Sequence, residues 1–268
     1  MPLQDYHTHT NFSFDSECPL EKLIESRRNA GIDNMAVTDH ADFSADDSEI
    51  NRLEKFTERF SLLQQQLETQ KRSVKDIDIA FGVEIGQPIF CPETASALVS
   101  GLPFDVVLAS QHEVPHQQDF YFVDFSGGKN LPLLDEYFNL LCKMIAWGDF
   151  DVLAHLTYPF RRMYRQGVKV DETRWFDAIS DVLKLLIKAN KAVEINLSPM
   201  PGGFEPMPTK TILAAYKDLG GTMITIGTDD HKAQHADYAR IGAELAKSLG
   251  FDSFTVYHKR EPRQVRFD

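Results

Sequence analysis

Short apolar stretches alternate with longer amphipathic stretches along almost the whole chain. The apolar stretches predict strands at residues 3–6, 34–38, 79–84, 105–109, 151–154, 192–196, 222–226 and 253–257. The amphipathic stretches between them predict helices at residues 19–30, 49–70, 92–99, 132–147, 173–189, 209–219 and 236–249. Repeated strand and helix pairs of this kind are typical of an α/β protein with a parallel sheet.

Proline and glycine support these helix boundaries. The prolines that suit first helical turns are Pro19, Pro92 and Pro132, and the glycines that suit positions just past helix ends are Gly31, Gly220 and Gly250. Seven or eight such units in 268 residues favour a TIM-like barrel over an open sheet, because barrels of ~250 residues repeat in this way. No stretch has the composition of a linker, so we expect residues 1–268 to form one domain.

The composition restricts the partners and the environment that we expect. A formal net charge of -12 opposes binding to nucleic-acid backbones or anionic membranes, so a small-molecule partner is expected. No apolar run approaches the ~18 residues of a transmembrane helix, and no signal-like segment precedes the first histidines, so we expect a cytoplasmic protein. Cys18, Cys91 and Cys142 lack paired spacing and are expected to be buried thiols.

Metal-binding residue types recur at the C-terminal ends of the predicted strands. Six histidines and three carboxylates have this placement: His7, His9, Asp15, His40, Glu84, His112, His155, Asp229 and His231. The strand ends of a barrel meet at one face, where such folds keep their active sites, so these side chains are predicted to converge. Imidazole and carboxylate together suit Zn²⁺, Mn²⁺ or Fe²⁺.

This prediction rests on the repetition of metal-binding residues at several strand ends, because one histidine after one strand is more often a structural residue than a ligand. In the segment DYHTHTNFSFDS, His7 and His9 share one side of an extended chain, since side chains at i and i+2 lie on the same face. The remaining histidines, His116, His235 and His258, are expected on the surface or in loops.

In this order, the residues resemble the polymerase-and-histidinol-phosphatase (PHP) family. The resemblance rests on the H-x-H start, the strand-end TDH, the strand-borne glutamate, two later strand-end histidines and a final D-x-H. The stretches DYHTHTNFSFDS, GVEI and EIN resemble its histidinol-phosphatase branch. The resemblance implies a distorted (β/α)7 TIM-like barrel with three divalent ions. It also implies hydrolysis of L-histidinol phosphate to L-histidinol and phosphate, a step of histidine biosynthesis, by a metal-bridged hydroxide.

The resemblance also implies how the ligands are shared. One ion takes His7, His9, Glu84 and Asp229, a second shares Glu84 and adds His112 and His155, and a third takes Asp15, His40 and His231. Many family members have histidine where this chain has Asp15, so the third site departs from the usual pattern.

Two groups are predicted to act on the phosphate. Asp229 could accept the proton of the attacking water, or it could be a metal ligand only. Arg161 and Arg162, on the predicted loop HLTYPFRRMYRQ, could hold the phosphate through paired donors, and Arg165 is a third candidate.

Four more polar residues and one aromatic run have alternative interpretations. Asp39 and Asp230 could orient metal-bound imidazoles or cap the following helices. Glu194 and Asn196 could contact a substrate amine. The run DFYFVDF, residues 119–125, could stack on a substrate ring, but packing in the core is favoured.

Three other functions remain open at this point. A PHP phosphoesterase could act on another substrate, such as a nucleotide phosphodiester. An amidohydrolase-like barrel also begins with H-x-H, but it usually has a bridging lysine where this chain has Glu84. A non-catalytic metal-binding module would be expected to have lost ligands, whereas this ligand set is essentially complete.

Overall fold

A barrel of seven parallel strands forms the centre of the computed structural model, which describes residues 1–268. The strands are β1 (Gln4–Asp5), β2 (Asn34–Val37), β3 (Asp78–Gly86), β4 (Val106–Ser110), β5 (Val152–Leu153), β6 (Ala192–Asn196) and β7 (Ile224–Gly227). Each strand pairs in parallel with the next. Backbone hydrogen bonds from Tyr6 N to Ile226 O and from Asp229 N to His7 O, both 2.8 Å, bring the last strand back to the first. The expected distorted (β/α)7 barrel is therefore confirmed.

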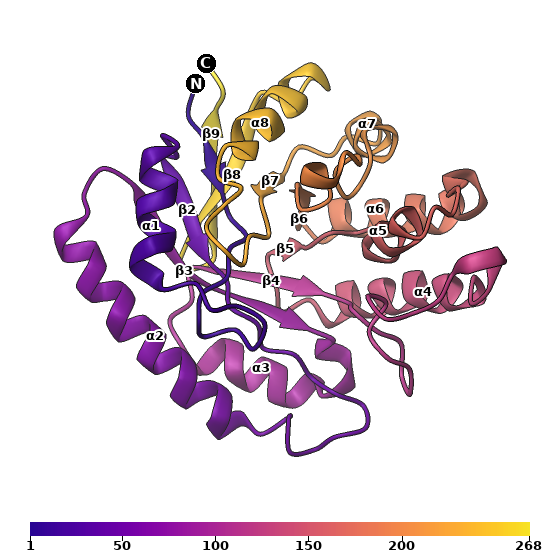
Figure 1. Ribbon diagram of the computed structural model, residues 1–268, viewed down its shortest axis with the longest axis horizontal. Helices are drawn as coiled ribbons and strands as arrows, with labels where there is room; N and C mark the ends of the chain where they lie inside the picture. The colour runs from indigo at the N-terminus through magenta and orange to yellow at the C-terminus, as the bar shows by residue number, and fades with distance from the viewer.

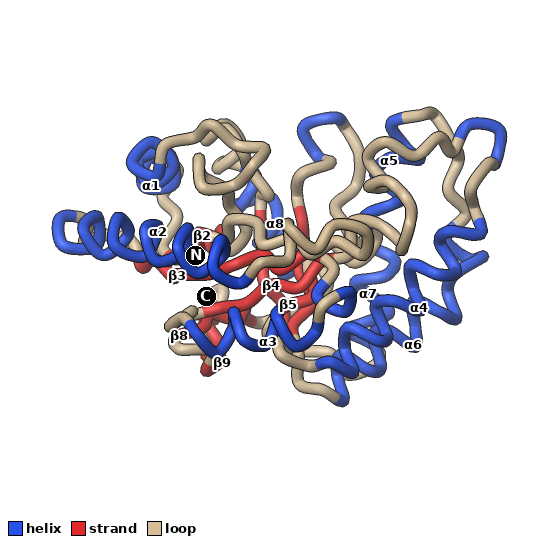
Figure 2. The backbone as a smooth tube through the Cα atoms, turned by 90° about the horizontal axis from the view of Figure 1, so that it is seen from below, coloured by secondary structure: helices blue, strands red, loops and turns tan.

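The helices surround these strands (Figures 1 and 2). They are α1 (Leu20–Asn29), α2 (Leu53–Ser73), α3 (Pro92–Gly101), α4 (Pro132–Trp147), α5 (Tyr158–Arg165), α6 (Phe176–Lys188), α7 (Lys210–Asp218) and α8 (Tyr238–Ser248). Short 3₁₀ helices lie at Pro88–Phe90, Ser126–Gly128, Glu172–Trp175 and Met200–Gly202. The barrel strands are buried on both faces because helices cover the sheet from outside, which explains their nearly continuous apolar character.

Two elements differ from the sequence prediction. The eighth predicted strand exists as β8 (Ser253–His258), but it pairs antiparallel with the unpredicted β9 (Glu261–Arg266) outside the main sheet. The polar sequence of β9 and its proline hide the strand pattern, because proline suits only edge strands. The segment predicted as a loop after His155 contains α5, which has Pro159 in its first turn.

A buried arginine links α1 to the barrel near the predicted site. Arg27 is fully buried, and its Nε lies 2.9 Å from Asp5 Oδ2, while its Nη1 lies 3.1 Å from Asp230 Oδ2. Arg27 Nη2 also donates to Thr228 Oγ1 at 3.0 Å. These contacts hold the first strand and the chain after β7 in register. They therefore also fix the positions of the predicted metal ligands on these two segments.

Other expectations concern the thiols and the helix ends. Cys18 is buried as expected, whereas Cys91 and Cys142 are half-buried, and none forms a disulfide. Gly31 and Gly220 take positive φ values of 71° and 93° just past helix ends, which glycine adopts without strain. None of the helices combines the length and apolar character that crossing a membrane requires.

Candidate metal centre

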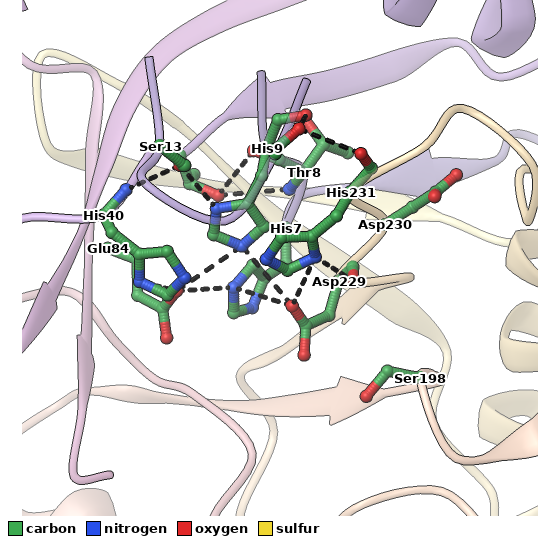
Figure 3. A network of polar contacts seen from close by, with 12 residues as sticks. His7, Thr8, His9, Ser13, His40, Glu84, Ser198, Asp229, Asp230 and His231 are labelled. Atoms are coloured by element: carbon green, nitrogen blue, oxygen red, sulfur yellow. Dashed lines mark hydrogen bonds and ion pairs between the residues drawn. The ribbon is translucent and has the colours of Figure 1, made fainter. Parts of the chain in front are cut away.

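All nine predicted metal ligands gather at the C-terminal ends of the barrel strands. A cavity of about 560 Å³ opens there, and seven of the nine residues line it: Asp15, His40, Glu84, His112, His155, Asp229 and His231. His7 and His9 are fully buried and complete the cluster (Figure 3). Their shared face arises because Thr8 forms a parallel bridge with Asp230, which keeps this segment extended beyond β1.

Glu84 lies at the middle of the cluster, and its two oxygens face different histidines. Oε2 is 3.0 Å from His7 Nε2 and 3.1 Å from His40 Nδ1. Oε1 is 2.9 Å from His155 Nε2 and 3.3 Å from His112 Nε2. Burial raises the pKa of Glu84, but the nearby histidines outweigh it and hold the pKa well below its ordinary value. An ionised carboxylate with its oxygens in two ligand groups has the arrangement of a bridging ligand.

Asp229 and Asp15 complete two further groups. Asp229 Oδ1 lies 3.4 Å from His9 Nε2 and 3.7 Å from His7 Nε2. Asp15 Oδ2 lies 3.0 Å from His231 Nε2 and 3.6 Å from His40 Nε2. The His9 ring stacks between those of His40 and His231, with centroid distances of 4.4 and 4.1 Å.

The donor atoms fit divalent metal ions. Four groups of three residues place their ligand atoms within 4.8 Å of one another: His9, His40 and His231; His7, His155 and Asp229; His7, His9 and Glu84; His40, Glu84 and His112. His9 Nε2 and His231 Nε2 are buried without a hydrogen-bond partner. Buried polar atoms are nearly always satisfied, so these two unsatisfied imidazole nitrogens on stacked rings indicate an additional binding partner. Mixed imidazole and carboxylate donors suit transition-metal ions.

The backbone is strained at two of these residues. His155 has φ of 26° and Asp229 has φ of 53°, values that non-glycine residues rarely adopt. Such strain persists where surrounding contacts hold a residue in place, and it concentrates at functional sites. At Asp229 the hydrogen bond from its N–H to His7 O supplies one of those contacts.

Glu194 holds two of the cluster residues in place, a role that the sequence did not reveal. His7 Nδ1 lies 2.7 Å from Glu194 Oε1, and His155 N donates to Glu194 Oε2 at 2.7 Å. Asn196 Nδ2 donates to Glu194 Oε2 at 3.1 Å and to Asp229 Oδ2 at 3.3 Å. The interpretation of Glu194 as a contact for a substrate amine was wrong, because its carboxylate is fully buried and engaged by the protein.

Charge within the cluster is balanced by its own side chains. Burial lowers the pKa of His7, but Glu194, Glu84 and Asp229 outweigh burial and raise that pKa well above its ordinary value. Burial of His9, reinforced by the neighbouring His231 and His40, lowers its pKa to about 3, so this imidazole is neutral. A neutral imidazole is the form that binds a metal ion.

The carboxylates next to the ligands have separate tasks. Asp39 accepts hydrogen bonds from Thr10 N at 2.7 Å and from Ser13 Oγ at 2.6 Å, and Ser13 Oγ lies 3.1 Å from His9 Nδ1. Asp39 therefore orients His9 through Ser13. Asp230 points away from the cluster in Figure 3 and accepts hydrogen bonds from the backbone N–H groups of Lys232, Gln234 and His235. It does not cap α8, whose N-cap is Asp237.

The two adjacent arginines of α5 point to different places. Arg161 lines the cavity, with Nη1 3.0 Å from Ser198 Oγ and 3.7 Å from Asp229 Oδ2. Arg162 instead donates from Nε to the Val123 carbonyl at 3.3 Å and is absent from the cavity wall. The structure thus brings Arg161 to the predicted ligands but not Arg162, whereas Arg165 also lines the cavity.

The residues of the aromatic run divide between the core and the cavity. Phe120, Val123 and Phe125 are buried, which confirms the packing interpretation for these residues. Tyr121 and Phe122 are exposed and line the cavity. Phe14 is also exposed there, and His116 and His258 lie on the surface as expected. His235 is in a loop as expected, but that loop borders the cavity.

A barrel of this topology with clustered histidines and carboxylates at its strand ends defines a class of protein. Residues 5–198 match the PHP domain, and the chain belongs to this family. The chain is 27% identical over 262 residues to the histidinol-phosphatase of Lactococcus lactis subsp. lactis, covering 94% of this chain and 93% of that protein. It is 28% identical over 239 residues to a probable histidinol-phosphatase of Thermotoga maritima, covering 86% and 85%.

A solved structure agrees with the fold. The crystal structure of the L. lactis histidinol phosphate phosphatase, complexed with zinc, L-histidinol and phosphate, superposes with a TM-score of 0.78. The two chains are 24% identical in this comparison, which covers 97% of this chain and 98% of that one.

Proposed function

We propose that this protein is a metal-dependent histidinol-phosphatase that hydrolyses L-histidinol phosphate to L-histidinol and inorganic phosphate. The observation that carries the proposal is the convergence of nine metal-binding side chains on one cavity that Arg161 also lines. The similarity to histidinol-phosphatases over most of the chain supports the substrate.

Three divalent ions would occupy the ligand sets that the family resemblance implies. They bring six positive charges, and the carboxylates that touch the cluster are Asp15, Asp42, Glu84, Glu194 and Asp229. Formal counting leaves about +1, to which Arg161 adds one more charge, so the centre would attract a phosphate dianion. When bound, divalent ions activate water and neutralise the charge that develops on the transferring phosphate.

Arg161 would hold the phosphate against the cluster. Its guanidinium lies over the Tyr158 ring, 4.7 Å from the centroid, and Ser198 Oγ accepts from one of its nitrogens. These contacts fix the side chain before substrate arrives, and a planar guanidinium can donate two parallel hydrogen bonds to phosphate oxygens. Positioning of this kind lowers the entropy lost in reaching the reactive geometry.

Asp229 would accept the proton of the attacking water. Its Oδ1 faces His7 and His9, whereas its Oδ2 faces Asn196 and Arg161 on the cavity side. Burial raises the pKa of Asp229, but the histidines outweigh burial and hold it well below its ordinary value. The carboxylate therefore stays ionised at neutral pH, which is the form that can accept a proton.

The outer part of the cavity suits the organic part of histidinol phosphate. Phe14, Tyr121 and Phe122 present exposed aromatic surface to the same space that the metal ligands line. An imidazole ring can stack on such surfaces. Asp119 also lines this space, and its negative charge would attract the substrate ammonium group.

A substrate panel tests the proposal. Purified protein loaded with Mn²⁺ or Zn²⁺ would be assayed for kcat/KM with L-histidinol phosphate, glycerol phosphate, a nucleoside monophosphate and a phosphodiester. We expect L-histidinol phosphate to exceed every other ester by at least ~100-fold, a discrimination of about 3 kcal/mol. A higher value for the phosphodiester would retain the metal centre and replace the proposed substrate.

A further inference from the structure

Asp42 touches two of the predicted metal ligands, although the sequence pattern did not single it out. Its Oδ1 lies 3.3 Å from His40 Nδ1, and its Oδ2 lies 3.3 Å from His112 Nδ1. His40 follows β2 and His112 follows β4, so one carboxylate spans side chains from two strands that are not neighbours. The Asp42 side chain is mostly buried and lines the cavity.

The nitrogens that Asp42 faces lie on the opposite side of each ring from the Nε2 atoms that approach the other ligands. His40 Nε2 lies 3.6 Å from Asp15 Oδ2. His112 Nε2 lies 3.3 Å from Glu84 Oε1 and 3.4 Å from His155 Nε2. Each ring thus presents Nε2 to one proposed metal group and Nδ1 to Asp42, although His40 Nδ1 also lies 3.1 Å from Glu84 Oε2. A carboxylate at the second nitrogen sets the tautomer and the ring orientation of a metal-bound imidazole.

Gly86 at the end of β3 has no side chain, and this leaves room for the Asp42 carboxylate. A Cβ atom at Gly86 would lie 2.4 Å from Asp42 Oδ1 and 2.6 Å from its Cγ, so no larger residue fits while Asp42 stays in place. The chain around Asp42 is held against β3 by hydrogen bonds from Ala41 N to Glu84 O at 2.7 Å and from Phe43 N to Gly86 O at 2.9 Å. His40 and Asp42 therefore point to the same face, as residues at i and i+2 do.

Two buried atoms at this position lack hydrogen-bond partners. These are His40 Nδ1 and Asp42 Oδ1, which face each other at 3.3 Å. Arg59 donates from Nη2 to the His40 carbonyl and so holds the backbone of the same segment from α2. A small rotation of the His40 ring would let its Nδ1–H donate to Asp42, satisfying both atoms at once.

We infer that Asp42 is a positioning residue that orients His40 and His112 together and thereby couples two of the three proposed metal sites. The site of His7, His9 and Asp229 makes no contact with Asp42 and would be independent of it. The inference rests on the metal centre of the proposed function but not on the identity of the substrate.

Metal binding by purified variants tests this inference. Asp42→Ala removes the carboxylate, and Gly86→Ala leaves it in the chain but fills the space that it occupies. We expect each variant to bind metal ~10- to 100-fold more weakly at the sites that contain His40 and His112, the usual effect of losing such a partner. Affinity at the site of His7, His9 and Asp229 should stay within about twofold of the wild type. Asp46→Ala, on the same loop but exposed, is the control that should bind like the wild type.

Equilibrium dialysis with elemental analysis would give the affinities, and Co²⁺ absorption spectra would report the ligand geometry. The double variant should be no weaker than either single variant, because both substitutions break the same contact. Asp42→Asn, which keeps size and one acceptor oxygen, should fall between the wild type and Asp42→Ala. If Gly86→Ala does not fold, Asp42→Asn takes its place as the second test variant.

Two results would overturn the inference. One is wild-type affinity and an unchanged Co²⁺ spectrum in the Asp42 variants. The other is equal weakening at all three sites together with a lower melting temperature of the metal-free protein, which would indicate a structural role only. Wild-type protein that binds metal but leaves L-histidinol phosphate intact would refute the proposed substrate and leave this test unaffected.

Discussion

His7 Nδ1 lies 2.7 Å from Glu194 Oε1, although the two residues are 187 positions apart in the chain. The contact leaves His7 Nε2 facing Glu84 Oε2 at 3.0 Å, so each nitrogen of the ring has one carboxylate partner. Gly227 lies beside this pair, and a Cβ there would come within 2.3 Å of Glu194 Oε1 and 2.4 Å of His7 Cβ. β6 and the end of β7 thus set the orientation of the first H-x-H histidine.

Glu194→Gln should weaken metal binding while keeping the fold. The amide can still accept one hydrogen bond, but it loses the negative charge that keeps the Nδ1 proton of His7 in place. We expect a ~10-fold or greater loss of metal affinity, measured by competition with a chelating dye. Unchanged affinity in a folded variant would show that the charge of Glu194 is irrelevant to the metal centre.

Arg161→Ala and Arg162→Ala form a matched pair, because the two arginines are adjacent on α5 but only Arg161 lines the cavity. Hydrogen bonds to charged groups contribute about 1.5–3 kcal/mol, so Arg161→Ala should lower kcat/KM roughly 10- to 100-fold. Arg162→Ala should stay within about twofold of the wild type. Steady-state kinetics with L-histidinol phosphate would measure both, and equal losses in the two variants would contradict a specific phosphate contact.

Asp229→Asn separates proton transfer from metal binding. The amide oxygen can still approach a metal ion, whereas the side chain can no longer accept the proton of water. We expect kcat to fall ~100-fold or more with little change in KM, which is typical of a lost general base. Elemental analysis of the same sample is the control. Near-normal phosphate release at full metal content would mean that Asp229 acts as a ligand only.

Arg27→Met should destabilise the protein strongly, and Arg28→Met should not. Arg27 is fully buried between Asp5 and Asp230, so its loss removes the positive charge that compensates two buried carboxylates, at a cost of about 3–5 kcal/mol. Arg28 pairs with Asp76 on the surface, where solvent screens the interaction. Urea unfolding would measure both variants. Similar free energies of unfolding for the two would show that the buried network contributes no more than the exposed pair.

The convergence of the nine metal-binding side chains could be predicted because each lies at or after the C-terminal end of a predicted strand, and parallel strands of a barrel end at one face. His7 and His112 illustrate this, since neither is near the other in sequence. The contact between Asp42 and His112 could not be predicted in the same way. It depends on the space above Gly86 and on an irregular chain beyond β2, neither of which has a periodic signal.

The role of Glu194 was misjudged for a related reason. Its position in β6 was predicted, but the side of the barrel wall that its carboxylate faces depends on strand register. The helix α5 was missed because it is short and follows directly after a strand-end histidine. The separation of Arg161 from Arg162 arises from that helix, since consecutive helical residues point in different directions.

The most direct test of metal-dependent hydrolysis is phosphate release from L-histidinol phosphate as metal-depleted protein is reloaded with Mn²⁺ or Zn²⁺. We expect no release above the blank without metal, and activity that rises with bound metal until three equivalents per chain are reached. Full activity in thoroughly metal-depleted protein would contradict the proposed function, and so would the absence of activity in fully loaded, folded protein.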